Sequence, residues 1–263
     1  CGQHAFTLQN DDGRIVFLLP FCHDFTLIGT TDSRVGEPAV EAPVSAAEID
    51  YLCRAANRYT RLPVTPDQVV WSFAGIRPLY DDGRADPSAV SREYVLQLDP
   101  GPPPALSVFG GKLTTYRSLA EKALHKLAPY FPEAGQPWTV DAALPGSEGD
   151  ETPAALGERL EKIHPDIAPE ILAGLVSRHG TRAESLLAGI KPAVDTTAET
   201  AGPLGRNFGG GLTEHEARHF IAHEWAQAAD DILWRRTKAG LFMSAAQRQT
   251  FADWLRLEME HRI

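Results

Sequence analysis

Long apolar runs are missing from this sequence. No stretch of about 18 uncharged apolar residues occurs in its 263 positions, so we expect no membrane-spanning helix. The opening CGQHAFTLQN lacks the basic start and apolar core that are typical of a secretory signal peptide. An apolar content of 43% still allows a substantial core, and the length suits one large domain or two ordinary ones.

Cysteine and basic charge are also scarce. Cys1, Cys22 and Cys53 are odd in number and widely spaced, which favours a reducing cytosolic setting over a disulfide framework. A net charge of −10 argues against general nucleic-acid binding. No methionine precedes Met243, and an apparent strand begins at His4, so we expect the chain to be a piece of a longer protein.

Short β-rich segments dominate the first half. Turn residues separate His4–Gln9, Ile15–Pro20 and Phe25–Gly29, which predicts an antiparallel meander. A capping box of Ser45 and Glu48 predicts a helix over residues 46–59. Further strands are predicted at Val69–Ala74, Glu93–Leu98 and Leu106–Phe109, and a further helix at Thr114–Leu127.

The composition changes after Pro132. Residues 133–152 are rich in proline, glycine and acidic side chains, which indicates a linker. Beyond it, helices are predicted at 153–163, 167–179, 181–189, 213–239 and 244–261, with a loop at 191–211. The predicted fold is therefore α+β: a mixed sheet-and-helix part at residues 1–135, followed by an all-α part at residues 136–263.

Residues 109–117, FGGKLTTYR, place Gly110, Gly111 and Lys112 directly before a helix. Glycine lets a ligand approach the backbone, and the first amides of a helix lie at the positive end of its dipole, so the segment suits an anion. Thr114 or Thr115 can cap the helix. The Walker spacing GxxxxGK[ST] is absent, and on this segment alone an ordinary glycine turn is favoured.

Two arginines follow strand ends or edges. Gly75–Pro78 places Arg77 at the end of a strand, and its planar guanidinium suits carboxylate or phosphate. Arg92 is a second candidate for an anion contact. An ion pair of Arg77 with Asp81–Asp82 and a solvated Arg92 are the simpler interpretations. Gly29–Asp32 suits a ligand rim and a turn equally well.

A rival motif lies in the helical part. His215 to His219 fits the pattern HExxH, in which two histidines on one helix face hold zinc and Glu216 is the general base. His223 continues the row, but no third ligand is marked, because Glu224 lies off that face. Such a pattern also arises by chance in polar helices, so we expect no metal site.

A charged segment, Asp230–Lys238, follows the histidines. Asp231 and Arg235 are spaced i,i+4, which predicts a network of charge pairs within one helix. A basic surface that contacts a partner or an anionic lipid is the alternative.

Six motifs occur in a recognisable order: RIVFLLPF, FTLIGTTD, VVWSFAGIRPL, SREYVL, LSVFGGKLTTYRSLAEKAL and ADDILWRRTKAGL. The series resembles FAD-dependent glycerol-3-phosphate dehydrogenases, aerobic respiratory enzymes of the D-amino-acid-oxidase-like flavoprotein superfamily, together with their oxidase relatives. It extends from about residue 5 to residue 260. The Rossmann GxGxxG of the family is absent, and so is the active-site histidine, because His4 lies inside the strand that follows that position. The resemblance therefore implies the C-terminal half of such an enzyme.

The resemblance also implies roles for the matched residues. The intact enzyme would oxidise sn-glycerol 3-phosphate to dihydroxyacetone phosphate by hydride transfer to FAD and pass the electrons to a quinone. Arg77, Arg92 and Lys112 would bind the substrate, and Arg77 and Lys112 would act in catalysis. Amides at a helix start, with Lys112, suit the negative charge of a reduced flavin. The implied cofactor-binding residues are Gly75, Gly110, Gly111, Lys112, Leu113 and Thr114.

Several expectations follow from this assignment. The isolated chain should hold little FAD and be inactive. The intact enzyme should be cytoplasmic, and contact with the inner membrane and a homodimer both stay open. A related FAD-dependent glycerophosphate or amine oxidase is the alternative within the same class. Outside it, the alternatives are a helical module for interaction or membrane docking and, least favoured, a zinc peptidase.

Overall fold

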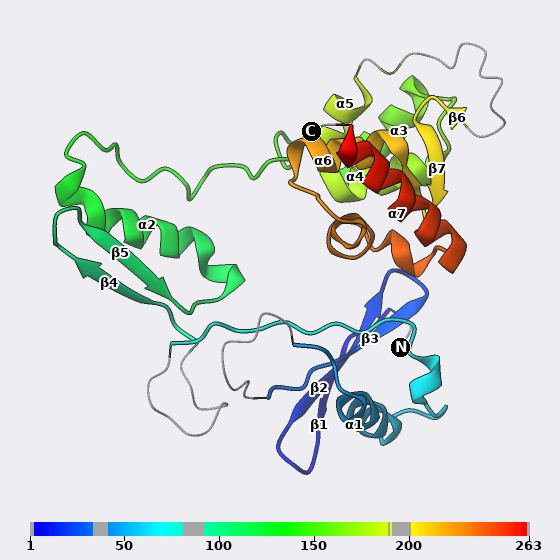
Figure 1. Ribbon diagram of the computed structural model, residues 1–263, viewed down its shortest axis with the longest axis horizontal. Helices are drawn as coiled ribbons and strands as arrows, with labels where there is room; N and C mark the ends of the chain where they lie inside the picture. The colour runs from blue at the N-terminus through cyan, green and yellow to red at the C-terminus, as the bar shows by residue number, and fades with distance from the viewer. Residues whose placement is uncertain (1–2, 34–41, 81–91, 189, 191–200, 262–263) are drawn as a thin grey trace. The chain divides into compact units, whose positions relative to one another are not determined.

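The computed structural model describes residues 3–33, 42–80, 92–188, 190 and 201–261. The chain divides into two compact units, Cys1–Asp141 and Ala142–Ile263 (Figure 1). Both helices and small antiparallel sheets are present, which confirms the predicted α+β class. Within the described ranges, no helix combines the length and apolar character needed to cross a membrane.

Three antiparallel strands open the first unit. They are β1 (Phe6–Gln9), β2 (Ile15–Phe21) and β3 (Phe25–Gly29), hydrogen-bonded in the order β1-β2-β3. Gly13 closes the first turn with a φ of +80°, a conformation that glycine adopts at little cost. Its amide donates to the Asn10 carbonyl at 3.0 Å. The predicted meander is thus confirmed.

Helix α1 (Ala46–Asn57) packs against this meander (Figure 1). The Glu48 amide donates to Ser45 Oγ at 3.2 Å, and the Ser45 amide donates to Glu48 Oε2 at 2.9 Å. This reciprocal pair is the predicted capping box, which satisfies two amides at the helix start. The buried core between helix and sheet consists of Leu8, Val16, Leu18, Ala55 and Ala56.

A hairpin and a helix complete the first unit. The two predicted strands are present as β4 (Val95–Asp99) and β5 (Ala105–Phe109), and they pair in antiparallel fashion. The chain then enters a 3₁₀ turn (Leu113–Thr115) and helix α2 (Tyr116–Leu127). The predicted helix is therefore confirmed, although its first turn is tighter than an α-helix.

The predicted strand at Val69–Ala74 is wrong. Within the described part of the chain this segment belongs to no sheet, and only a short 3₁₀ turn, Pro66–Gln68, precedes it. Its aromatic side chains instead stack on each other and on an aromatic ring of β2. Trp71 stacks on Phe73 with ring centroids 4.6 Å apart and lies 6.4 Å from the ring of Phe21. The β-type composition thus reflects aromatic stacking rather than a backbone ladder.

Three helices begin the second unit. They are α3 (Pro153–Ile163), α4 (Pro169–His179) and α5 (Arg182–Leu187), close to the predicted ranges. Thr152 caps α3, because its hydroxyl accepts the Ala155 amide at 3.2 Å. Their shared core includes Leu156, Leu160, Leu172, Leu175, Val176, Leu186 and Leu187.

A small sheet follows, and this corrects the predicted loop at 191–211. Residues 191–200 lie outside the described residues, but β6 (Ala201–Gly202), β7 (Gly205–Gly209) and β8 (Leu212–Thr213) form antiparallel ladders. The turn between β7 and β8 uses Gly209–Gly211, whose φ angles are +99°, +58° and +74°. Consecutive glycines therefore allow a tight reversal where the sequence indicated only a loop.

The predicted single helix at 213–239 is also wrong. Helix α6 (Glu214–His223) ends early. Trp225 then adopts a φ of +54°, and a right-handed helix cannot continue through a residue with a positive φ. A π-helical turn, Asp231–Arg236, follows, and α7 (Ala245–Glu260) completes the chain. The core of this region includes Phe208, Leu212, Phe220, Ile232, Leu233, Phe251 and Leu255.

Candidate functional site

Asp32 joins the two arginines that the sequence singled out. Its Oδ2 lies 2.5 Å from Arg77 Nη1 and 3.5 Å from Arg92 Nη2. The predicted alternative partner of Arg77, Asp81–Asp82, lies outside the described residues. Three separate motifs, those of Asp32, Arg77 and Arg92, therefore meet at one carboxylate. Among the described residues, these two guanidinium groups and one carboxylate sum to a positive charge, which suits an incoming anion.

The turn at Gly110 and Gly111 lies against the segments that carry these arginines. Gly110 has a φ of +69°, and a Cβ built on it would lie 3.1 Å from the Glu93 carbonyl oxygen and 3.4 Å from the Tyr80 amide. Glu93 follows Arg92, and Tyr80 lies three residues after Arg77. Glycine is required here both by the backbone angle and by this close approach. The turn therefore sits beside both arginine-bearing segments.

Lys112 stands exposed where this turn enters the helix. The Thr115 hydroxyl donates to the Lys112 carbonyl at 2.9 Å. Thr115 stands at the N-cap of α2, but its side chain caps no helix amide, so the predicted capping by Thr115 is not observed. Within the described part of the chain, the Lys112 ammonium forms no ion pair. Leu113, the next residue, is 90% exposed. The first turn of the helix thus presents a cation and backbone amides to its surroundings.

Gly75 and Thr114 complete the predicted set. Among the described residues, a Cβ on Gly75 would meet no atom within 4 Å, so packing within the chain does not require glycine there. Thr114 is exposed beside Leu113. An open glycine two residues before Arg77 leaves room for a ligand to reach the backbone.

The HExxH motif does not form a zinc site of the expected kind. His215 Nε2 lies 2.6 Å from the Leu186 carbonyl oxygen, away from His219. Glu216 is fully buried and pairs with Arg178 Nε at 2.6 Å and with His179 Nε2 at 2.9 Å. A carboxylate held in this way cannot serve as the general base on a metal-bound water. The zinc-peptidase alternative is therefore wrong.

Burial and charge act in opposite directions on Glu216. Burial raises the pKa of this carboxyl, while the hydrogen bond from His179 and the charge of Arg178 lower it, with a net pKa below the usual value. For His219, burial and the neighbouring His179 lower the pKa. Glu216 is thus ionised and His219 neutral near neutral pH.

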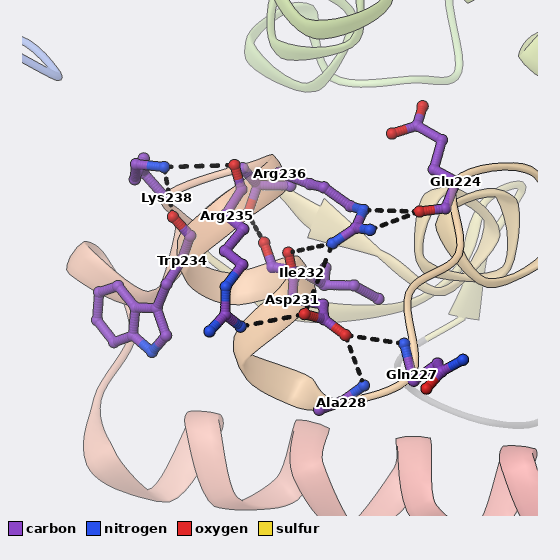
Figure 2. Close-up of polar contacts among 10 residues, drawn as sticks. Glu224, Gln227, Ala228, Asp231, Ile232, Trp234, Arg235, Arg236 and Lys238 are labelled. Carbon is purple, nitrogen blue, oxygen red and sulfur yellow. Dashed lines mark hydrogen bonds and ion pairs between the residues drawn. The ribbon is translucent and has the colours of Figure 1, made fainter. Parts of the chain in front are cut away.

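In the charged segment, the Asp231 carboxylate accepts backbone amides and also forms an ion pair (Figure 2). Asp231 Oδ2 accepts the Gln227 amide at 2.9 Å and the Ala228 amide at 3.0 Å. The other oxygen pairs with Arg235 Nη1 at 3.0 Å, which confirms the predicted i,i+4 pair. The amide of Gln227 is the main reason why the pKa of Asp231 is lowered.

Two basic side chains of the same segment also point to backbone carbonyl groups (Figure 2). Arg236 donates to the Glu224 carbonyl from Nε at 3.0 Å and to the Asp231 carbonyl from Nη1 at 3.1 Å. Lys238 Nζ contacts the Trp234 carbonyl. These contacts favour the internal network over a basic docking surface.

Arg178 and His179 are the partners of Glu216, and the sequence analysis missed both of them. Both lie at the end of α4, and their partner Glu216 lies 38 and 37 positions away. No local pattern linked them, because an isolated Arg-His pair at a helix end is also typical of charge that favours the helix dipole.

Comparisons with known proteins agree with the motif series. Residues 2–117 match the family described as FAD dependent oxidoreductase, and residues 138–257 match the C-terminal domain of alpha-glycerophosphate oxidase. The chain belongs to this family of FAD-dependent oxidoreductases. The resemblance drawn from the sequence is thereby confirmed. Arg77, Arg92 and Lys112 all fall within the part that matches the flavoenzyme family.

Named relatives of this flavoenzyme family cover almost the whole chain. A glycerol-3-phosphate dehydrogenase of Pseudomonas aeruginosa is 44% identical over 99% of the chain and 50% of its own length. A D-erythritol 1-phosphate dehydrogenase of Brucella abortus is 41% identical over 96% of the chain and 49% of its own length. The aerobic glycerol-3-phosphate dehydrogenase of Escherichia coli is 39% identical, with the same two shares of 96% and 49%. The chain thus spans about half the length of the curated relatives that it matches.

Proposed function

We propose that this chain is part of an FAD-dependent dehydrogenase that oxidises sn-glycerol 3-phosphate to dihydroxyacetone phosphate. The observation that carries the proposal is the meeting of Arg77 and Arg92 at Asp32, beside the glycine turn that leads to Lys112. Two relatives that carry the glycerol-3-phosphate dehydrogenase name support the choice of substrate.

The two arginines are proposed to hold the substrate phosphate. A phosphate dianion binds best to planar guanidinium groups that donate two hydrogen bonds each. Asp32 lies between Arg77 and Arg92. We infer that the substrate phosphate competes with Asp32 for Arg77.

The glycine turn is proposed to lie against the flavin. FAD would supply the acceptor for a hydride from C2 of the substrate. Gly110 and Gly111 would give it close backbone access, and Lys112 with the amides of the 3₁₀ turn would offer it positive charge. The exposure of this turn and the open Cβ position of Gly75 fit such a group. The remaining contacts to FAD are assigned to a part of the enzyme beyond this chain.

We further propose that the electrons pass to a quinone, with the enzyme on the cytoplasmic face of a membrane. The name of the Escherichia coli relative, aerobic glycerol-3-phosphate dehydrogenase, supports a respiratory acceptor. The helical second unit, which matches the C-terminal domain of alpha-glycerophosphate oxidase, is the proposed place for a homodimer or membrane contact.

A second substrate is supported by a specific observation. The D-erythritol 1-phosphate dehydrogenase of Brucella abortus is 41% identical to this chain, close to the 44% of the first glycerol-3-phosphate dehydrogenase. Both named substrates are phosphorylated polyols, so the same two arginines would serve either one.

The test uses the full-length polypeptide that contains this chain, assayed with both polyol phosphates and with a quinone analogue or oxygen as acceptor. Arg77→Lys should raise KM for the phosphorylated substrate by about tenfold or more, because charged hydrogen bonds contribute about 1.5–3 kcal/mol. Lys112→Met should lower kcat by about 100-fold, as loss of one charge-stabilising donor does elsewhere. Arg54→Lys, an exposed control on α1, should change neither constant. An unchanged KM in Arg77→Lys would refute the phosphate role.

A further inference from the structure

Three potential ligand side chains converge in the second unit, apart from the proposed flavin site. Among the described residues, His179, His219 and Glu224 each place one nitrogen or oxygen within 4.8 Å of the other two. His179 Nδ1 lies 3.9 Å and His219 Nε2 lies 3.7 Å from Glu224 Oε1. The two histidine rings meet edge to face, with centroids 5.2 Å apart.

A buried ion pair fixes the orientation of His179. Its Nε2–H donates to Glu216 Oε1 at 2.9 Å, and Arg178 holds the same carboxylate through Nε at 2.6 Å and Nη2 at 2.9 Å. This hydrogen bond assigns the proton to Nε2 and leaves a lone pair on Nδ1, which faces Glu224. Metal-binding histidines commonly donate their second ring N–H to a carboxylate in this way. Phe220, whose ring lies 5.4 Å from that of His179, limits further rotation.

The backbone of His179 is held as firmly as its ring. Gly180, the next residue, has a φ of +57°, and a Cβ there would lie 1.8 Å from the Gly146 carbonyl oxygen. That same carbonyl accepts the Thr181 amide at 2.9 Å. The end of α4 is therefore clamped against the segment at Gly146, so His179 has a fixed position.

Arg236 anchors Glu224 through its main-chain carbonyl. Arg236 donates to the Glu224 carbonyl from Nε at 3.0 Å and from Nη2 at 2.5 Å. In Figure 2 the carboxylate points away from Arg236. Its side chain is 40% exposed, so it can rotate toward the two histidines.

We propose that His179, His219 and Glu224 bind a divalent first-row transition metal, and zinc in particular. Two imidazoles and one carboxylate are a known three-residue zinc ligand set, with a fourth position left for water. Zn–N distances of about 2.0–2.1 Å imply a spacing of about 3.3 Å between ligand atoms in tetrahedral geometry. The separations of 3.7 and 3.9 Å from Glu224 Oε1 lie within about 0.6 Å of this spacing, and the ligand atoms of the two histidines lie within 4.8 Å of each other.

The metal would bridge two elements of the second unit. His179 ends α4, which belongs to one hydrophobic cluster of the second unit, whereas His219 and Glu224 lie in and after α6, which belongs to the other. Coordination would join the two clusters at residues far apart in sequence. Glu216 remains a positioning residue that acts through His179. This site is independent of the proposed dehydrogenase activity.

The test measures zinc binding to the purified 263-residue chain after removal of metal with a chelator. Isothermal titration should give one zinc per chain, and cobalt substitution should give the visible absorption of a tetrahedral site. His219→Ala should weaken binding at least about 100-fold, and Glu216→Gln about 10- to 100-fold. Glu224→Gln, a mild change at a half-exposed side chain, should also weaken binding and covers the case in which His219→Ala fails to fold.

Two further variants act as matched controls. His261→Ala, at the exposed end of α7, should leave the affinity unchanged. His215→Gln should also retain zinc, because His215 points to the Leu186 carbonyl instead. Loss of zinc in His215→Gln with retention in Glu224→Gln would overturn the assignment. The absence of stoichiometric binding at micromolar zinc would overturn it as well.

Discussion

Glu216 carries a fully buried charge in the second unit, and its neutralisation should destabilise that unit. Its side chain has no exposed surface, and it accepts two hydrogen bonds from Arg178 and one from His179. Glu216→Gln keeps the shape of the side chain but removes its charge. The Arg178 guanidinium then remains partly buried without a counter-charge, which is the costly situation for an ion pair.

The magnitude follows from the geometry of the pair. Removing one partner of a buried ion pair costs about 3–5 kcal/mol. The Arg178 side chain keeps 20% exposure, and water can solvate it in part. Glutamine can also still accept one hydrogen bond. We therefore expect a loss of about 2–3 kcal/mol in the free energy of unfolding at neutral pH.

The effect should depend on pH in a defined direction. The folded-state pKa of Glu216 lies below the usual value of 4.5, so its ionised form contributes stability that is present above about pH 4.5. That contribution is lost as the pH falls through the folded-state pKa. The difference between the natural chain and Glu216→Gln should therefore shrink on acidification below pH 4.5.

Urea denaturation of the 263-residue chain, followed by tryptophan fluorescence with a chelator present, measures this difference. Glu260→Gln is the matched control, because its pair with Arg256 is exposed on both sides and should be worth at most about 0.5 kcal/mol. A double-mutant cycle with Arg178→Met isolates the coupling between the two charges. Equal losses in the two glutamine variants, or a coupling energy below about 0.5 kcal/mol, would refute the reasoning.

Two further predictions concern the hydrogen bonds of the Asp231 carboxylate and the binding of the cofactor. Asp231→Ala leaves the Gln227 and Ala228 amides without their carboxylate acceptor, so urea denaturation should show a loss of about 1–2 kcal/mol, whereas Arg235→Ala should cost less than 1 kcal/mol. The purified 263-residue chain should show almost no flavin absorbance after incubation with FAD and gel filtration, because Gly110–Thr114 offers only one side of the proposed pocket; stoichiometric yellow protein would contradict this.

Local signals explain the elements that the sequence predicted well. The capping box of Ser45 and Glu48 and the turn ending at Gly13 are each complete within four residues, so no distant contact is needed to recognise them. The i,i+4 pair of Asp231 and Arg235 spans five residues and is equally local.

Longer-range packing explains the errors. Val69–Ala74 has the composition of a strand, but its aromatic rings stack on each other and on Phe21. The helix predicted over 213–239 ends at His223, because the exposed Trp225 turns into the left-handed region and Ala226 is buried instead. Helical periodicity alone does not reveal such a reversal, since the residues on both sides of it are good helix formers.

The two candidate sites differ in how far the sequence could reach them. Asp32 and Arg77 each follow a glycine closely and so carried a local signal. Arg92 was expected at a strand edge, but β4 begins only at Val95, so its meeting with Asp32 depends on tertiary structure. At the HExxH motif the local signal was misleading. Helical spacing alone groups His215 with His219, but the buried carboxylate between them is claimed by Arg178 and His179 from another helix. Because an ionised Glu216 cannot stay buried without those partners, α4 determines which histidine faces His219. The ion pair of Glu216 with Arg178 and His179 therefore decides which histidines of the fold lie together. The i,i+4 spacing of His215 and His219 along α6 does not.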